Sequence, residues 1–184
     1  CTFSRFDAHM GVANATIRNS TLGHQGINAI GSGIFTVENS TIYGRNLINL
    51  RSDYGSTWQG EFVIRNCVFV PAGGRPTRAS LIGGSYSGQH DFGYTCYMPE
   101  RITIDTLHID DSSHPADYQG PAILANFNPR MTDDSFVEKF PYVRTREVIL
   151  RNVTTASGNA LRLSDNPFMF KDVKVTDNEP PPDR

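Results

Sequence analysis

Residues with the chemistry of sugar recognition lie close together between Leu50 and Trp58. Arg51 and Asp53 are two positions apart, and Tyr54 and the single tryptophan, Trp58, follow them. Aromatic faces stack on sugar rings, and a guanidinium pairs with carboxylates such as those of uronic acids. We therefore expect Arg51 and Asp53 to be catalytic and Tyr54 and Trp58 to bind substrate. The alternative is a surface ion pair between Arg51 and Asp53, with Trp58 covering a loop.

Two long loops contain further candidates. Residues 83–100 are rich in glycine and tyrosine and contain His90 and Tyr94, and loops on a rigid scaffold are common binding sites. Residues 108–120 contain side chains suited to a hard cation: Asp110, Asp111, His114 and Asp117. Their spacing is not that of a regular calcium loop. Calcium is therefore the weaker alternative to a solvated loop, and we expect no metal site and no cofactor.

A recurring phrase defines the elements that must position these residues. It reads TIRNSTL at 16–22, TVENSTI at 36–42, VIRNCVF at 63–69, TIDTLHI at 103–109, LRNVTT at 150–155 and FKDVKV at 170–175. The shared polar position is filled by Asn19, Asn39, Asn66, Thr106, Asn152 and Asp172, at separations of 20, 27, 40, 46 and 20 residues. A constant unit with insertions of variable length is typical of a solenoid.

The asparagine of this phrase has two interpretations. Asn14, Asn19, Asn39 and Asn152 lie in Asn-X-Ser/Thr sequences, which are N-glycosylation acceptors in secreted proteins. A sharp bend between strands instead requires a left-handed backbone, which Asn tolerates better than most residues. The bend explains every copy and glycosylation explains only some, so we favour the structural role. Stacked from unit to unit, these side chains would also form a hydrogen-bonded asparagine ladder.

The sequence of each unit predicts two short strands on either side of the bend, then a variable loop, then a third strand. The third strands are expected at 6–10, 27–31, 47–53, 79–84, 122–127 and 160–165. Three parallel strands per turn, with turns about 4.8 Å apart, form an all-β parallel solenoid. Residues 1–3 match the second half of the phrase, so we expect the sequence to begin partway through a unit of a longer chain. One short helix is expected at 132–140.

The phrase (T/V)-I-x-N-(S/C)-(T/V)-(L/F), followed by I-N-(A/L)-(I/R), resembles the repeat of the pectin-lyase-like superfamily across nearly the whole chain. The resemblance implies a right-handed single-stranded parallel β-helix of about six or seven coils with long loop insertions. It also implies a polysaccharide groove on the sheet of third strands. Superfamily members include polysaccharide lyases, polygalacturonase-like hydrolases, epimerases and phage tailspike depolymerases, and the fold alone does not select among them.

Two catalytic patterns of that superfamily are not matched. The third strands lack the cluster of acidic residues that forms the calcium site of pectate lyases. The segments GHQ at 23–25 and DD at 110–111 stand in the wrong order for a polygalacturonase.

Alternation along the third strands predicts which side chains face the groove. If Ala8, Ala29 and Leu50 face inward, the outward side chains are Asp7, His9, Asn28, Ile30, Asn49 and Arg51. We expect His9 and Arg51 to be catalytic, because either could abstract the proton beside a uronate carboxylate if its pKa were lowered. Asp53 is the third catalytic candidate. Substrate binding is expected from Asp7, Asn28, Asn49, Tyr54, Trp58, His90 and Tyr94.

Composition limits the partners. The formal net charge is −2 and the isoelectric point about 6.2, without the basic patch that nucleic-acid binding needs. No apolar run approaches the roughly 20 residues of a membrane span. Three cysteines without CxxC spacing are expected to be buried thiols. We expect one domain at 1–176, a proline-rich linker at 177–184, and a location outside the cell or on its surface.

The predicted function is extracellular polysaccharide processing by a lyase or glycoside hydrolase in a groove along one sheet, with an acidic glycan as the candidate substrate. One alternative is a non-catalytic carbohydrate-binding, adhesin-like β-helix. Another is a structural segment of a phage tailspike, which would form a homotrimer. Flanking domains of a longer chain are further expected partners.

Overall fold

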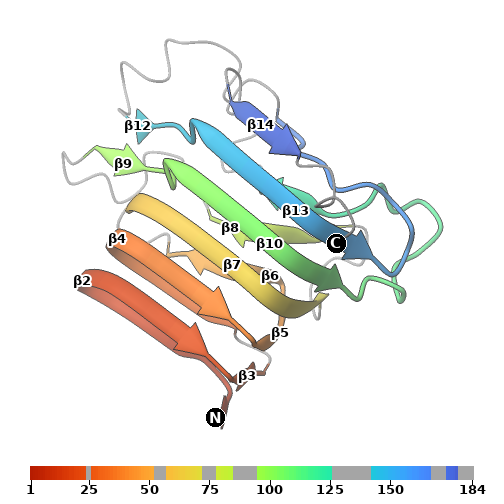
Figure 1. Ribbon diagram of the computed structural model, residues 1–184, viewed down its shortest axis with the longest axis horizontal. Helices are drawn as coiled ribbons and strands as arrows, with labels where there is room; N and C mark the ends of the chain where they lie inside the picture. Colours follow the sequence, from red (N-terminus) through yellow and green to blue (C-terminus); the bar gives the residue numbers. More distant parts are fainter. Residues whose placement is uncertain are drawn as a thin grey trace, which may run out of the picture.

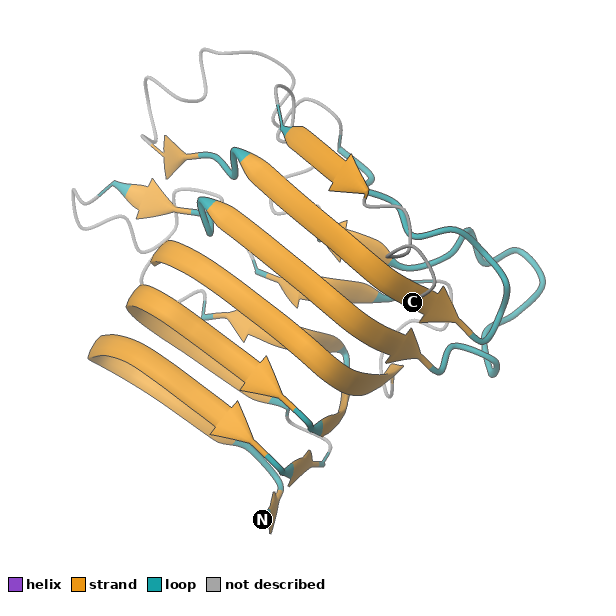
Figure 2. Ribbon diagram, viewed as in Figure 1, coloured by secondary structure: helices purple, strands orange, loops and turns teal. Residues whose placement is uncertain are grey.

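The computed structural model describes residues 1–23, 26–51, 57–71, 78–84, 95–125, 142–166 and 173–177, which form strands and connecting loops (Figure 2). The strands are β1 (Thr2–Phe3), β2 (Phe6–Arg18), β3 (Thr21–Leu22), β4 (Ile27–Glu38), β5 (Thr41–Gly44), β6 (Asn46–Leu50), β7 (Trp58–Pro71), β8 (Ser80–Gly83), β9 (Cys96–Tyr97), β10 (Arg101–Ile109), β11 (Ala122–Leu124), β12 (Tyr142–Val143), β13 (Glu147–Thr155) and β14 (Lys174–Asp177). The expected all-β class is confirmed for these residues. The expected helix at 132–140 and the tail beyond 177 lie outside them. Within the described residues, no helix is long and apolar enough to cross a membrane.

Parallel pairing builds the sheet. β2, β4, β7, β10, β13 and β14 lie side by side in one layer, and β6 and β8 lie behind it (Figure 1). The first half of β4 pairs with β6 and its second half with β7, so one strand contributes to two arrays. β7 likewise pairs with β4 and then with β5. Among the described strands every pairing is parallel, so the chain crosses back between neighbours of each array.

The strand register confirms the first four predicted separations. Arg18 pairs with Glu38, and Glu38 with Arg65, at offsets of 20 and 27 residues. Arg65 pairs with Asp105, and Asp105 with Arg151, at offsets of 40 and 46 residues. The insertions therefore lengthen the connections without moving the strands out of line.

The fifth predicted separation, the 20 residues between Asn152 and Asp172, is wrong. The sequence predicts Asp172 opposite Asn152, but Glu147 pairs with Lys174, at an offset of 27 residues rather than 20. β14 therefore pairs with the half of β13 that precedes its bend at Asn152 and not with the half that follows it. Asp172 lies outside the described residues. Apolar residues alternate in both halves of the unit, so the valines of this segment fit either half.

Two rows of alternating charge cross the front layer, and we call them the charge ladders. They are Glu61–Arg101–Glu147–Lys174 and Glu38–Arg65–Asp105–Arg151. Arg101 lies 3.2 Å from Glu61 and 2.7 Å from Glu147. The second row includes pairs at 4.0 Å and 3.8 Å. Opposite charges on neighbouring strands favour this register over its alternatives.

Every described bend has the predicted left-handed backbone. The φ angle is 52° at Asn19, 49° at Asn39, 51° at Asn66, 59° at Thr106 and 49° at Asn152. A β-branched residue rarely adopts this conformation, so the fourth bend is strained. The predicted asparagine ladder is wrong, because the described bend side chains are exposed. Each lies at a convex corner, where the side chain points into solvent.

The residue after the bend asparagine explains the rest of the repeated phrase. Ser20 Oγ, Ser40 Oγ and Cys67 Sγ each donate to the carbonyl oxygen two residues earlier, at 2.8, 2.7 and 3.2 Å. The side chain thus satisfies a carbonyl group at the corner where the chain bends. Asn-Ser therefore has a structural explanation at both of its residues, without reference to glycosylation.

A second line of bends, which the repeat does not predict, lies at the other end of the front layer. Asn14 has a φ of 64°, and its Oδ1 accepts the Ile34 N–H at 2.9 Å. Gly33 and Gly60 continue the line with φ of 81° and 135°. A Cβ on Gly60 would lie 2.2 Å from the Gly33 carbonyl oxygen, so only glycine fits there.

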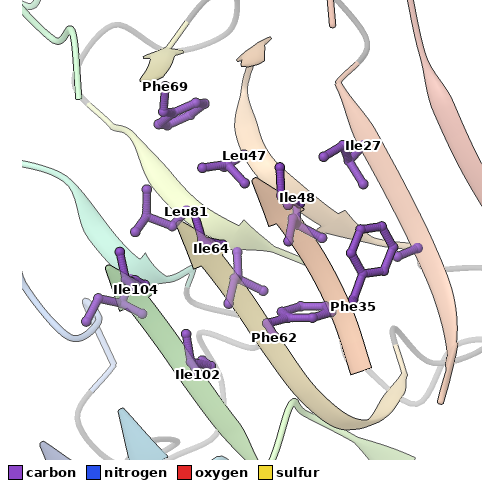
Figure 3. Close-up of a cluster of buried hydrophobic side chains, with 14 of the residues drawn as sticks. Ile27, Phe35, Leu47, Ile48, Phe62, Ile64, Phe69, Leu81, Ile102 and Ile104 are labelled. Carbon is purple, nitrogen blue, oxygen red and sulfur yellow. The ribbon is translucent and has the colours of Figure 1, made fainter. Parts of the chain in front are cut away.

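Apolar side chains from all these arrays meet between the layers (Figure 3). Apolar residues of neighbouring strands stack in register and form rows such as Ile27–Ile48–Ile82–Leu124. Phe35 and Phe62 lie opposite each other with ring centroids 5.7 Å apart in an edge-to-face arrangement. Burying one such side chain contributes about 1.5–3 kcal/mol. This core holds the outward side chains of each strand in fixed rows.

Candidate functional site

The predicted polar row is present in the register. Asp7 pairs with Asn28, Asn28 with Asn49, and Asn49 with Gly83. The residues that alternate with them are buried, as predicted: Ala8, Ala29 and Leu50. The sequence therefore correctly places three of its candidate binding residues on one line across β2, β4 and β6.

A chain of side-chain hydrogen bonds runs along this line, and we call it the amide row: Ser80, Asn46, Asn49 and Asn28. Ser80 Oγ donates to Asn46 Oδ1 at 2.6 Å, and Asn46 Nδ2 donates to Asn49 Oδ1 at 3.3 Å. Asn49 Nδ2 donates in turn to Asn28 Oδ1 at 3.2 Å. Because all three bonds run in the same direction, each polarises the next.

Asn46 and Asn49, the two central members of the amide row, have more hydrogen-bonding groups than the row uses. Its four side chains are half-buried, so they are fixed in place but reach the surface. A carboxamide has two N–H donors and two acceptor lone pairs, and the bonds of the row use one donor and one acceptor site of Asn46 and of Asn49. The surface therefore presents neutral donors and acceptors along the direction in which the strands stack.

Gly83 makes room for this arrangement. A Cβ at Gly83 would lie 2.1 Å from Asn46 Nδ2 and 2.7 Å from Asn46 Oδ1. The Asn46 side chain thus lies directly over the neighbouring strand. Asn46 and Ser80 are absent from the sequence-based prediction. The sequence pattern gives little indication of these two residues, because each is the first residue of its strand, where apolar alternation has only just begun.

Charged residues lie at the β2 end of the amide row. Arg51 Nη1 lies 2.7 Å from Asp7 Oδ1, and Arg5 Nη2 lies 3.0 Å from Asp7 Oδ2. Arg51 therefore pairs with Asp7, which is 44 residues away in the sequence. The Asp7 carboxylate fixes the position of the Arg51 guanidinium on this surface, and the catalytic role of Arg51 stays a prediction.

A β-bulge alters the geometry predicted for His9. The register between β2 and β4 shifts between Ala8 and Val12, so His9 lies among extra residues and is exposed. Ile30, predicted to face outward, is 3% exposed and therefore buried. Ile30 lies where β4 passes from pairing with β6 to pairing with β7, and strict alternation does not continue through that change of partner.

Trp58 does not lie on the predicted binding surface. Its side chain is completely buried, and its Nε1 donates to the Gly33 carbonyl at 3.0 Å. Its ring packs edge-to-face against Phe35, with centroids 5.2 Å apart, and is tilted against Phe62. A tryptophan whose N–H has a backbone partner is a stable core residue, so its assignment to substrate binding is wrong.

Four candidate residues lie outside the described part of the chain. They are Asp53, Tyr54, His90 and Tyr94. Their assignments stay predictions.

A second polar cluster, which the sequence only partly predicts, joins the loops after β10 and β13. Asp111 has no exposed surface, and it accepts hydrogen bonds from the backbone N–H and the Oγ of Ser157, both at 2.7 Å. His114 stacks on Tyr118 with ring centroids 4.1 Å apart. Burial, and then the nearby Asp111 carboxylate, raise the pKa of Tyr118. The Tyr118 hydroxyl is buried without a hydrogen-bond partner in the structure.

The two buried members of this cluster offer almost no surface to a polymer. Asp111 and Tyr118 are 0% and 4% exposed, so neither can touch a polysaccharide. Asp111 instead ties two loops together across 46 residues. Within the described residues no group of three potential ligands could hold a metal ion. The cluster thus stabilises the fold.

The thiols divide into two kinds. Cys67 and Cys96 are each 3% exposed, as predicted. Burial raises the pKa of Cys67, and raises that of Cys96 to about 12, so both are neutral and unreactive near pH 7. Cys1 is exposed, contrary to the expectation, because it precedes β1, which lies at the edge of the sheet and pairs only with β3 among the described strands.

Comparisons with protein-family models, with curated proteins and with solved structures each found no match. The likeness to the pectin-lyase-like superfamily therefore stays a prediction from the repeated phrase.

Proposed function

We propose that the chain forms a right-handed parallel β-helix that binds a polysaccharide along the amide row. The parallel pairing, the recurring register and the left-handed bends support the solenoid. In such a fold each strand of the β4–β6–β8 array belongs to a successive coil.

The observation that supports binding is the continuous hydrogen-bonded row itself. Buried amides usually pair within the core, but these four side chains pair with one another while reaching the surface. The strands stack about 4.8 Å apart, which is close to the length of one pyranose unit in an extended glycan. A linear polysaccharide lying along the row would thus meet one coil per sugar residue.

Binding is the part of the predicted activity that the geometry favours. Two of the proposed catalytic groups behave differently from the roles predicted for them: Arg51 is engaged by Asp7, and His9 lies in a bulge. Linear polysaccharides are components of walls, capsules and matrices. We therefore place the protein outside the cell or on its surface.

The test is a binding titration of the purified chain against linear oligosaccharides by calorimetry. The variant Asn49→Ala removes the central member of the row and should weaken binding about tenfold, as expected for the loss of one to two hydrogen bonds. Thr36→Ala on the front layer is the matched control and should bind like the unmodified protein. Equal affinity of Asn49→Ala and the control would overturn the proposed site.

The same samples, followed by reducing-end release and by the ultraviolet absorbance of unsaturated products, report on turnover. Binding without product supports a binding module. Product formed by the unmodified chain and lost in Arg51→Ala would instead support the lyase or hydrolase predicted from the sequence.

A further inference from the structure

We infer that the amide row selects neutral glycans over uronic acid polymers. This inference rests on the proposed function and concerns the chemical class of its ligand. It follows from the charges at the two ends of the row and from the neutral groups between them.

The arginines at both ends already hold carboxylates of the chain. At the β2 end, Asp7 lies between Arg51 and Arg5, at 2.7 Å and 3.0 Å. At the other end, Ala122 pairs with Ser80 and with Arg162, so Arg162 continues the column that begins at Asn46. Arg162 pairs with Asp165 and donates to the Gly120 carbonyl at 3.1 Å.

A uronate would have to compete with these internal carboxylates. If it displaced Asp7 from Arg51, it would gain one ion pair and break another, and two carboxylates would then lie close together. Arg5 leaves this end with one excess positive charge, but its side chain is 49% exposed, so solvent and salt screen it.

Neutral hydroxyl groups meet no such competition. Between the charged ends the row offers only carboxamides and a hydroxyl, which exchange hydrogen bonds with water or with sugar hydroxyls at little electrostatic cost. A sugar hydroxyl both donates and accepts, and so matches groups that do the same.

The experiment uses matched probes on the full chain. Oligogalacturonides of one length are tested with free carboxylates and with fully methyl-esterified carboxylates, beside neutral cello-, manno- and xylo-oligosaccharides, at low and high ionic strength. The tightest binder should be neutral, its affinity should not change with salt, and free oligogalacturonide should bind at least about tenfold more weakly.

Tightest binding by the free carboxylate form, falling as salt rises, would overturn the inference and leave the proposed binding function in place. Absence of binding to every probe would overturn both. The variant Asp7→Asn provides a second test, because it removes the internal competitor. It should increase affinity for free oligogalacturonide about tenfold, and an unchanged affinity would contradict the competition on which the inference rests.

Discussion

The two polar surfaces of the molecule differ in how they use hydrogen bonds and charge. The two charge ladders on the front layer alternate in sign. Arg101, which lies between two glutamates in the first ladder, is 49% exposed. The amide row behind this layer contains neutral, half-buried side chains that bond in one direction across β8, β6 and β4. Both cross several strands in register, but only the first is built from side chains of opposite charge.

This difference separates polar side chains that fix the strand register from polar side chains that are suited to binding a ligand. Alternating charges on adjacent strands penalise a shifted register, because a shift brings like charges together. They satisfy each other and need no ligand. Neutral amides specify register less strongly and keep unused donors and acceptors, so they suit a ligand of hydroxyl groups.

The largest effect is expected where a predicted binding residue is in fact part of the core. Trp58→Ala should lower the free energy of unfolding by about 3–5 kcal/mol, because it leaves a cavity beside two phenylalanines. Denaturant-induced unfolding measures this loss, with Asn49→Ala as the comparison, expected to cost less than about 1.5 kcal/mol. Near-normal stability of Trp58→Ala with weaker glycan binding would return Trp58 to the binding surface.

A smaller gain in stability is expected at the fourth bend. Thr106 adopts a φ of 59°, the conformation that asparagine occupies in the other described bends. Thr106→Asn should therefore stabilise the protein by about 1 kcal/mol by removing strain at a β-branched residue. A thermal or denaturant melt measures the gain. Lower stability would show that the hydrogen bond of Thr106 to Asp105 outweighs the strain.

The smallest effect is expected in the charge ladders. Arg101→Ala removes two exposed ion pairs and leaves Glu61 and Glu147 without their shared partner. Stability should fall slightly at low ionic strength, and the difference from the unmodified protein should shrink as salt is added. Unfolding curves at two salt concentrations measure this. A loss independent of salt would mean that Arg101 acts through packing.

The repeat could be predicted because it is local. Each bend residue and its flanking strands occur within seven residues of sequence, so Asn19, Asn39 and Asn66 align on inspection and their left-handed backbone follows. The last unit fails because Val173 and Val175 match apolar positions on either side of a bend. The deciding feature is the pairing of Glu147 with Lys174, which appears only once the strands are stacked.

The candidate site was predictable only in part, since its contacts are distant in sequence. Period-two alternation places Asp7, Asn28 and Asn49 on one line. The same rule cannot foresee that Arg51 reaches Asp7 across 44 residues, or that Ile30 is buried where β4 changes its partner from β6 to β7.

Gly83→Ala tests most directly whether the amide row binds glycans, because it removes no hydrogen-bonding group. The added methyl group would occupy the place of the Asn46 side chain, 2.1 Å from its Nδ2, and push it out of the row. The circular dichroism spectrum should be unchanged, and affinity for the tightest-binding oligosaccharide should fall about tenfold. In an Asn46→Ala background, Gly83→Ala should cause no further loss of affinity. Unchanged affinity in the single variant would contradict the assignment of the row as the glycan-binding surface.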